Sequence, residues 1–381
     1  MGDSAETVIV GGGIAGLAVA IALRQRGVET VVLEQASELR EIGAGFLLGP
    51  NGCAVLERLG ALAGLRAGHS VSVPRWELRD MKGRLLSALT IPRDGEHSLS
   101  TRRSDLQAAL LACLPRETVL PGCEVIRGSF ASGGVTLTLA DGREWLARRV
   151  IIADGAHSKI RASFWPGREP HYLGYIGWRG LVDHVPAGWE GGRVCESWGH
   201  GRRFGIAPVG GGRTYWYASA NVAGPNCRDR VGIDQLREDF AGWHAPVAEI
   251  LDTMPDAELL QHPISDLIPP RSWQIEEKVV LIGDAAHPLS PNLGQGASMA
   301  LEDAWELALQ WGRPDAMAQF ERKRRWRLRK LWALSRWLGT MIQWENPLLC
   351  RGRDVQMRVM PDAVATAMMR RFLRHEPGYT A

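Results

Sequence analysis

A glycine-rich turn near the start of the chain constrains the fold more than any other feature. Its sequence, GGGIAG, occupies residues 11–16 and stands directly between an apolar β-branched run and a segment of helical periodicity. In a βαβ dinucleotide-binding unit, Gly11 permits the tight turn, Gly13 lets the backbone approach a pyrophosphate, and Gly16 lets the helix pack on the strand. The N-terminus of that helix offers free N–H groups and a positive dipole end to the phosphates. We therefore expect a parallel sheet that binds a dinucleotide.

The second strand of this unit, residues 30–33, ends at an acidic residue. Glu34 follows Gly16 by eighteen positions. Its carboxylate is placed to accept hydrogen bonds from the hydroxyls of a ribose. The alternative is a glycine-rich turn with Glu34 on the surface. The turn and the acid do not by themselves separate FAD from NAD.

The composition limits the class of protein. With 381 residues, 45% of them hydrophobic, the chain is expected to form two domains. Lys and Arg number 45 against 42 for Asp and Glu, so the charge gives no reason to expect a nucleic-acid partner. The six cysteines form no CxxC pair, which argues against a metal site and suits a reducing cytosol. An acidic start and the lack of a long apolar run predict a cytoplasmic protein with no membrane partner. The expected state is a monomer or homodimer, which the sequence does not decide.

The pattern changes in the middle of the chain. From about residue 173 to 220, stretches rich in Trp, Tyr and Val alternate with glycine turns, as in an antiparallel sheet, and residues 76–89 alternate in the same way. The expected fold class is α/β, with a Rossmann-like FAD-binding domain, an inserted and mostly antiparallel β-sheet substrate domain, and a C-terminal helical segment. The expected boundaries are 1–72, 101–165 and 273–312 for the first domain, 73–100 and 166–272 for the second, and 313–381 for the helices.

Further motifs follow the glycine turn in a fixed order. They are GAG at residues 43–45 with Arg40 before it, RSDL at 103–106, DGAHSKIR at 154–161, and GDAAHP at 283–288 continuing to PNLGQG at 291–296. Together they resemble the FAD-contacting motifs of the class A FAD-dependent monooxygenases, the aromatic hydroxylases that share the para-hydroxybenzoate hydroxylase fold. The resemblance extends over nearly the whole chain at typical spacing.

The resemblance implies a set of FAD-binding residues. Asp284 ends a buried strand and can bind a ribityl hydroxyl, while the helix after Gly294 directs its positive end at the flavin. On their own, Asp154 and Asp284 could equally be a turn aspartate and a helix N-cap. The implied set is Gly11, Gly13, Ile14, Ala15, Gly16, Glu34, Gln35, Arg40, Gly45, Arg103, Asp154, Asp284, Pro291, Gly294, Gly296 and Ala297.

Residues 198–217 resemble one branch of the family, which contains urate-hydroxylase-like and zeaxanthin-epoxidase-like proteins. In the urate-hydroxylase-like members an arginine and a tyrosine twelve positions apart contact the substrate, and Arg203 and Tyr215 match them. An arginine stabilises a substrate anion and a tyrosine hydroxyl orients the ring. The alternative is that Arg203 pairs with a surface acid and Tyr215 packs across strands. Further candidates for the substrate pocket are Trp178, Arg179, Trp198 and Trp216.

A basic run, ERKRRWRLRK at residues 321–330, invites a membrane or nucleic-acid interpretation. Trp326, however, is followed by Leu and Trp residues largely at helical spacing as far as Met341. Basic residues beside such a stripe are more often the solvated face of a docked helix, and this is what we expect.

The resemblance also implies the reaction. NADH or NADPH would bind transiently and reduce FAD, and a flavin hydroperoxide would hydroxylate a small aromatic or heteroaromatic substrate with one atom of O2. Two alternatives stay open: epoxidation of an olefin by the same flavin, and a flavin-binding oxidoreductase without oxygen insertion. The WxWxIP string of flavin halogenases is absent.

Overall fold

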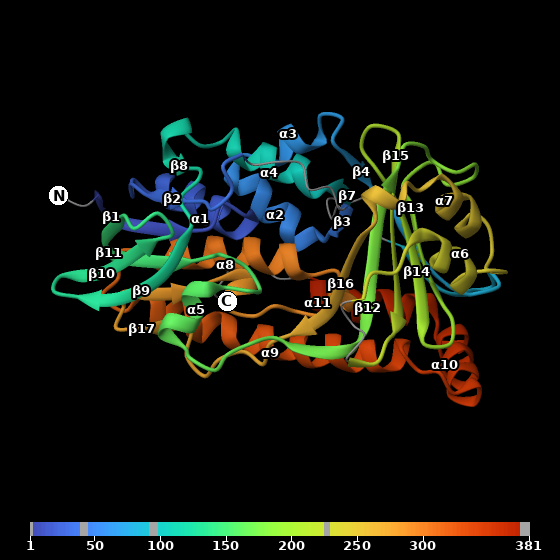
Figure 1. Cartoon of the computed structure of the whole chain (residues 1–381). Coiled ribbons are helices and arrows are strands. Elements are labelled where there is room, and N and C mark those ends of the chain that lie inside the picture. The colour runs from blue at the N-terminus through green and yellow to red at the C-terminus, as the bar shows by residue number, and fades with distance from the viewer. Residues whose placement is uncertain (1–2, 39–44, 91–97, 225–228, 374–381) are drawn as a thin grey trace.

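The computed structural model describes residues 3–38, 45–90, 98–224 and 229–373, and they form two halves that lie side by side (Figure 1). The half at the left of Figure 1 contains the glycine turn, and we call it the Rossmann-like half. The half at the right is dominated by a tall, mostly antiparallel sheet. The long helix α9 (Ala316–Ile342) runs beneath both.

The Rossmann-like half is built on an eight-stranded sheet. Its main path is β17-β18-β11-β1-β2-β8, and β9 and β10 form an antiparallel ribbon on β11. The strands are β1 (Asp3–Val10), β2 (Val31–Leu33), β8 (Val119–Leu120), β9 (Val125–Ala131), β10 (Gly134–Leu139), β11 (Glu144–Ile152), β17 (Gln274–Ile275) and β18 (Val279–Leu281). The pairs from β18 to β8 are parallel, so their carboxyl ends meet at one edge, where open α/β sheets bind ligands.

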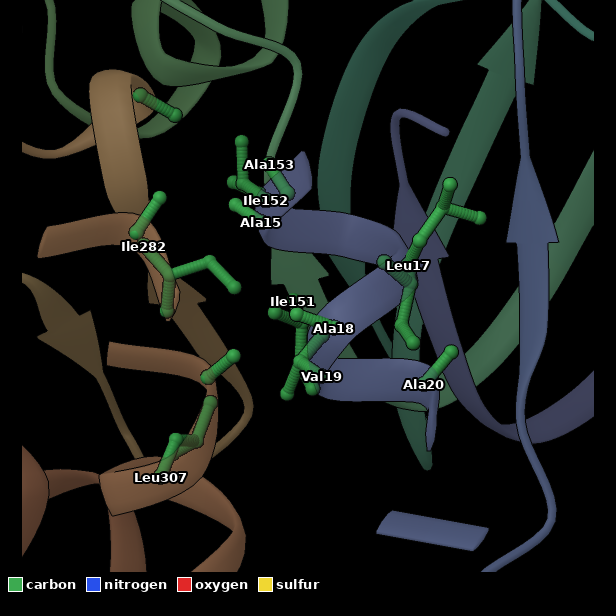
Figure 2. Close-up of a cluster of buried hydrophobic side chains, with 14 of the residues drawn as sticks. Ala15, Leu17, Ala18, Val19, Ala20, Ile151, Ile152, Ala153, Ile282 and Leu307 are labelled. Atoms are coloured by element: carbon green, nitrogen blue, oxygen red, sulfur yellow. The ribbon is translucent and has the colours of Figure 1, made fainter. Parts of the chain in front are cut away.

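Helices pack against this sheet and form its core with it. Figure 2 shows the small and apolar side chains of α1 beside Ile151 of β11 and Leu307 of α8, and all of Leu17, Ala18 and Val19 are fully buried. The helices of this half are α1 (Ile14–Arg24), α2 (Pro50–Leu59), α3 (Leu62–Arg66), α4 (Arg103–Leu111), α5 (Lys159–Phe164) and α8 (Gly296–Gln310). Small side chains let α1 approach both neighbours closely, which fixes the position of its N-terminus.

The second half is a seven-stranded sheet in the order β16-β12-β15-β14-β13-β5-β6. Its strands are β5 (Arg75–Asp80), β6 (Leu85–Thr90), β12 (His171–Val182), β13 (Arg193–Trp198), β14 (Arg202–Val209), β15 (Arg213–Asn221) and β16 (Leu260–Asp266). The strands β5 and β6 join it, as the alternation over residues 76–89 predicts. All pairs are antiparallel except β13 with β5. The expected fold class is confirmed.

The two faces of this sheet have different neighbours. One face, the outer face, packs into an apolar core with α6 (Ile233–Asp239) and α7 (Val247–Thr253). The other, the inner face, carries Arg179, Arg203 and Tyr215. A small sheet of β3 (Gly45–Leu48), β4 (Ser70–Ser72) and β7 (Leu99–Arg102) contacts β14 from the Rossmann-like half. The inner face is therefore the one that meets the Rossmann-like half.

The chain continues after α9 with α10 (Pro347–Val359) and α11 (Asp362–Leu373), and both contact β6. Short 3-10 helices are η1 (Arg116–Thr118), η3 (Asp256–Glu258), η4 (Gly283–Ala285) and η5 (Pro291–Leu293). Among the described residues, none of the helices combines the length and the apolar composition that crossing a membrane requires.

Candidate active site

The glycine turn has the geometry that a close-packed βαβ turn requires. Gly11 has φ +105°, and a Cβ atom there would lie 2.6 Å from the carbonyl oxygen of Ala153. At Gly16 a Cβ would lie only 1.9 Å from the carbonyl oxygen of Gly11. Gly13, the N-cap of α1, adds no side-chain hydrogen bond to the helix end. The first N–H groups of α1, which include those of Ile14 and Ala15, are thus free to bind an anion.

Glu34 lies beside this turn, held by two backbone N–H groups. Its carboxylate accepts hydrogen bonds from Gly12 N (2.5 Å) and Ala36 N (2.8 Å), and its side chain is half-buried. A carboxylate has about four acceptor positions, so capacity remains for ribose hydroxyls. Gln35 follows on the exposed side. The residues at this end of the sheet fit the adenosine side of a dinucleotide.

Arg103 brings a positive charge to the same turn. It is the first residue of α4, is exposed, and its Nη2 atom lies 3.8 Å from the position that a Cβ of Gly13 would take. Gln107, one turn later, donates to the carbonyl oxygen of Gly12 at 2.8 Å and so ties α4 to the turn. The guanidinium and the N-terminus of α1 together form an anion site of the kind that binds a pyrophosphate.

Asp284 lies where two positive features converge. It belongs to η4, directly after β18, and its Oδ1 atom is 3.9 Å from the position of a Cβ on Gly296, the first residue of α8. Its side chain is reached by solvent, yet the surrounding protein atoms raise its pKa by desolvation while His287 and Arg103 lower it. Gln295, the N-cap of α8, makes no capping hydrogen bond, so the helix end stays open beside this carboxylate. An acid at an open helix end fits a ribityl hydroxyl and a flavin ring.

The loop before α8 and the first turn of α8 carry further residues of the expected FAD-binding set. Pro291 is exposed at the start of η5, and Gly294 has φ +62°, a conformation that favours glycine. Gly296 and Ala297 are half-buried in the first turn of α8. Gly45 is the first residue of β3. Arg40 lies outside the described residues.

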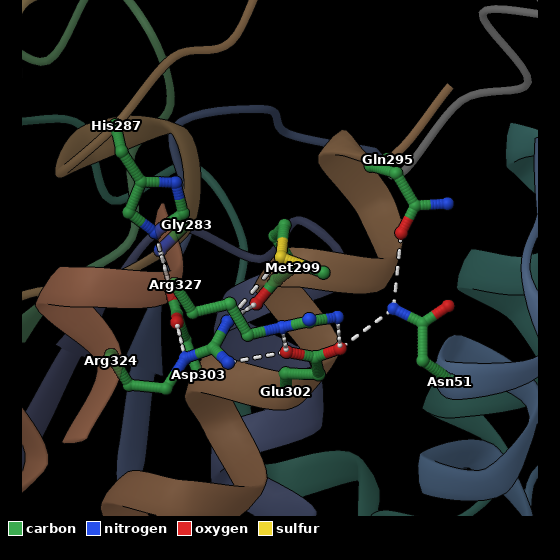
Figure 3. A network of polar contacts seen from close by, with 9 residues as sticks. All are labelled: Asn51, Gly283, His287, Gln295, Met299, Glu302, Asp303, Arg324 and Arg327. Atoms are coloured by element: carbon green, nitrogen blue, oxygen red, sulfur yellow. Dashed lines mark hydrogen bonds and ion pairs between the residues drawn. The ribbon is translucent and has the colours of Figure 1, made fainter. Parts of the chain in front are cut away.

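A buried polar network supports the N-terminus of α8 from behind, and Figure 3 shows it. Arg324 of α9 donates to Asp303 (2.7 Å) and forms a short ion pair with Glu302, both on α8. Asp303 also accepts from Gly283 N at 2.9 Å and contacts Nε2 of His287 at 2.5 Å. Burial alone would raise the pKa of Asp303, but its contacts with His287 and Arg324 more than offset this and lower it to about 2.

The network reaches the glycine-turn side through Asn51 of α2. Its amide donates to Glu302 at 2.7 Å and to the side-chain oxygen of Gln295 at 3.1 Å. Arg327 binds both oxygens of Glu302, each at 2.9 Å. These residues were not singled out by the sequence analysis, and the expectation that the basic run is solvated is wrong for Arg324, which is fully buried. The available signal was that Arg324 shares one helical face with the buried Leu328 and Leu331.

The DGxxSxxR segment, residues 154–161, makes hydrogen bonds within the protein. Ser158 caps α5 by accepting from Arg161 N, and the buried Arg161 guanidinium donates to Ala285 O at 2.9 Å. Asp154 is half-buried, accepts from Ile160 N at 3.4 Å, and has its pKa raised by burial. The segment therefore joins the end of β11 to η4, which carries Asp284.

Arg203 lies on the inner face at the centre of a second polar cluster. It is 3% exposed, donates from Nε to Ser219 at 3.1 Å, and pairs with Glu196 at 3.7 Å. Burial lowers its pKa, but Glu196 and nearby tyrosines more than offset this and raise it. Glu196, which the sequence analysis missed, also accepts from Trp198 Nε1 (2.5 Å) and from the hydroxyl of Tyr217. The partner of Arg203 is thus a buried acid and not a surface one.

Tyr215 stands where the sheet meets the Rossmann-like half. A Cβ on Gly45 would lie 2.4 Å from the Tyr215 ring, so the ring rests on the backbone of β3. Desolvation raises the pKa of the buried Tyr215 hydroxyl, and Arg179 beside it opposes that shift. Arg179 is half-buried, and its Nε atom has no hydrogen-bond partner among the described residues. Tyr215 and Arg179 therefore lie together at the boundary of the two halves.

Two of the four other candidates for the substrate pocket lie on the outer face of the sheet, away from the Rossmann-like half. Trp178 and Trp216 are on the outer face, 2% and 0% exposed, and belong to the core under α6 and α7. Each directly neighbours an inner-face residue in its strand, Arg179 or Tyr215, and successive side chains in a strand point to opposite faces. Trp198 is on the inner face but packs against Met341 and Ile342 of α9. These positions correct the expected pocket lining.

Comparison with known proteins bears on this arrangement. Residues 134–331 match the FAD binding domain family, and residues 9–40 match the NAD(P)-binding Rossmann-like domain. The chain is 33% identical to Aurachin C monooxygenase/isomerase of Stigmatella aurantiaca, covering 97% of this chain and 98% of that protein. It is 32% identical to 2-heptyl-3-hydroxy-4(1H)-quinolone synthase of Pseudomonas aeruginosa, over 93% and 94% of the two chains. The structure of Klebsiella pneumoniae HpxO with FAD and uric acid is similar at a TM-score of 0.87, with 27% identity over 97% of this chain and 96% of that one.

Proposed function

The chain belongs to the family of FAD-dependent aromatic monooxygenases, and from that premise we propose that it uses NADH or NADPH to hydroxylate a nitrogen-containing aromatic ring with an ionisable oxygen. One C–H bond of the ring becomes C–OH, with one oxygen atom of O2. The other oxygen atom leaves as water, and NAD(P)H with one proton supplies the two electrons. Bound FAD supplies the hydride acceptance and oxygen activation that side chains lack.

The observation that carries the proposal is the polar inner face of the seven-stranded sheet. Arg203 and Tyr215 stand on neighbouring strands of this face, and Tyr215 contacts β3 of the Rossmann-like half. A buried guanidinium stabilises the anionic form of a ring hydroxyl, which makes the ring electron-rich. The tyrosine hydroxyl would orient the ring.

The residues around the glycine turn would hold FAD. Glu34 would accept hydrogen bonds from the ribose, while Arg103 and the N-terminus of α1 would bind the pyrophosphate. Asp284 would bind the ribityl chain, and the open N-terminus of α8 would stabilise negative charge on the flavin ring. Asp154, whose Oδ1 atom has no hydrogen-bond partner among the described residues, would also accept a hydrogen bond from FAD.

The substrate class follows from the relatives. One relative is a 2-heptyl-3-hydroxy-4(1H)-quinolone synthase, and the similar HpxO structure holds uric acid. Both ring systems contain nitrogen and oxygen that can share a negative charge. We propose quinolone-like and purine-like rings before simple phenols.

The test begins with the purified protein and its visible spectrum. We then expect NADH or NADPH oxidation to accelerate with quinolones, xanthines or hydroxybenzoates, and mass spectrometry to find one oxygen-18 atom in the product made under oxygen-18 gas. Fast NAD(P)H oxidation without label in any product would contradict the proposal and favour an oxidoreductase without oxygen insertion. Label delivered to an olefin and not to a ring would favour an epoxidase.

A further inference from the structure

The outward side of α9 differs from what its sequence predicts. The apolar stripe was expected to dock, but Trp326 and Trp337 are 66% and 58% exposed. They are eleven positions apart, close to three helical turns, so they lie on one side of the helix. Leu328, Leu331 and Met341 do dock. The helix therefore has a second, exposed face that carries two large aromatic side chains.

Positive charge surrounds these tryptophans. Arg322, Arg329 and Lys330 are exposed, and the described residues give them no ion pair with a carboxylate. The single acidic residue of α9, Glu321, is buried. The Nζ atom of Lys330 lies 4.7 Å from the centre of the Trp326 ring. This face presents cations with nothing of opposite sign between them.

The helix that follows adds apolar surface. Leu348 and Leu349, at the N-terminal end of α10, are 80% and 50% exposed. We define the α9 face as Arg322, Trp326, Arg329, Lys330 and Trp337 with these two leucines. Two exposed leucines and two exposed tryptophans on consecutive helices are an apolar surface of the kind that a binding partner covers.

We propose that the α9 face binds the surface of a membrane that contains anionic phospholipids. Lys and Arg would meet the phosphate headgroups. Tryptophan rings settle at the level of the headgroups, and leucines enter the acyl boundary. The helix would lie along the surface and not cross it. This inference does not rest on the proposed function.

Two other occupants fit less well. In a symmetric dimer through this face, Arg322, Arg329 and Lys330 of each copy would meet the same cations of the other, which is repulsive. A nucleic acid would satisfy the cations, but its phosphate backbone would leave Leu348 and Leu349 uncovered. A bilayer surface satisfies both the charge and the apolar groups.

Residues of α9 also line a groove on this side of the molecule. The groove has a volume of about 770 Å³ and is lined by Arg336, Thr340 and Gln343 of α9 and by Tyr175 of β12, among others. The amide of Asn292, in the loop before α8, donates to the hydroxyl of Tyr175 at 3.0 Å. If α9 lies on a membrane, the mouth of this groove is close to the lipid surface.

The experiment is co-sedimentation of the whole protein with large vesicles. We expect binding to vesicles of 70% phosphatidylcholine and 30% phosphatidylglycerol, weakening as salt rises, and at least tenfold weaker binding to pure phosphatidylcholine. The double variant Arg329→Glu/Lys330→Glu should lose at least tenfold in partition coefficient. Trp326→Ser/Trp337→Ser should also weaken binding, and the remaining binding should depend more steeply on salt.

The matched control is Arg116→Glu/Arg127→Glu, which makes the same change in charge at exposed positions of the Rossmann-like half. It should bind vesicles within about twofold of wild type, and all variants should keep the wild-type melting temperature. Equal binding to both vesicle types, or an equal loss in the control, would overturn the proposal. So would a dimer, seen by sedimentation, that only the Arg329→Glu/Lys330→Glu variant dissociates, or DNA binding without vesicle binding.

Discussion

Each half of the molecule buries an arginine among polar groups, and the two arginines are held very differently. Arg324, in the Rossmann-like half, has contacts at all three guanidinium nitrogens and pairs with both Glu302 and Asp303. Arg203, on the sheet, has one carboxylate partner among the described residues, Glu196, at 3.7 Å. A guanidinium has five N–H donors, so the looser arginine retains donors that a ligand can use. A saturated arginine indicates support of the fold, and an unsaturated one indicates a binding site.

Removal of the saturated arginine should have the largest effect. Arg324→Met leaves the buried carboxylate of Asp303 without its guanidinium partner and leaves Glu302 with the cation of Arg327, which costs about 3–5 kcal/mol. We expect a large fall in the melting temperature and a poor yield of folded protein. Arg329→Met, on the exposed side of the same helix, should change the free energy of unfolding by less than about 0.5 kcal/mol. Similar melting temperatures for the two variants would show that the network is not the support that we describe.

A variant at Glu34 tests whether the polar groups of the Rossmann-like half bind FAD. Glu34→Ala removes charged hydrogen bonds worth about 1.5–3 kcal/mol each, so FAD affinity should fall roughly 10- to 100-fold. Fluorescence titration of the apoprotein with FAD measures this directly. Glu29→Ala, an exposed acid nearby, is the control. Unchanged affinity in Glu34→Ala would remove this residue from the proposed site.

Arg203→Met should weaken substrate binding and hydroxylation, because it removes a buried charged donor worth about 1.5–3 kcal/mol. We expect a drop in kcat/KM of roughly 10- to 100-fold, and a weaker substrate-induced change in flavin absorbance. Arg202→Met is the matched control, since Arg202 points to the outer face and pairs with Asp239 at 2.8 Å. Unchanged kinetics with a lower melting temperature would make Arg203 as structural as Arg324.

Unfolding at acid pH is a second test of the network around Arg324. The pKa of Asp303 is lowered from 3.8 to about 2, so its stabilisation is fully present above pH 3.8 and is lost as pH falls toward 2. The shift corresponds to about 2 kcal/mol. Between pH 4 and 2, wild type should therefore lose more stability than Asp303→Asn, measured by urea unfolding. Parallel curves for the two proteins would disagree with this pairing.

The smallest expected effect belongs to Tyr215→Phe. The ring and its contact with Gly45 are kept, and only the hydroxyl is lost, at a cost of about 0.5–1.5 kcal/mol. The substrate KM should rise a few-fold, and more hydrogen peroxide should form per NAD(P)H because the ring is held less firmly. Product and peroxide yields measure this. An unchanged ratio of hydrogen peroxide to product would mean that Tyr215 acts only through packing.

Features that depend on a short stretch of sequence could be predicted. Contacts between residues far apart in the sequence could not. The glycine turn, Glu34 and Asp284 are short strings at the ends of strands, so their positions follow from the strands. The alternation over residues 76–89 also placed β5 and β6 correctly. Alternation could have excluded Trp178 and Trp216, because their strand neighbours Arg179 and Tyr215 face the other way. Glu196 and the pairing of Arg324 with Glu302 could not be predicted, because they depend on which strands and helices become neighbours.

The order of strands in the Rossmann-like half has a consequence for synthesis on the ribosome. The central strand β11 pairs with β1 and β18, and about 270 residues separate the end of β1 from the end of β18. At roughly 5–20 residues per second, β1 and β2 emerge some 15–55 s before the last of these strands. During that time an apolar strand edge of the nascent chain has no native partner. We therefore expect the yield of folded protein to depend on chaperone supply and translation speed as well as on final stability.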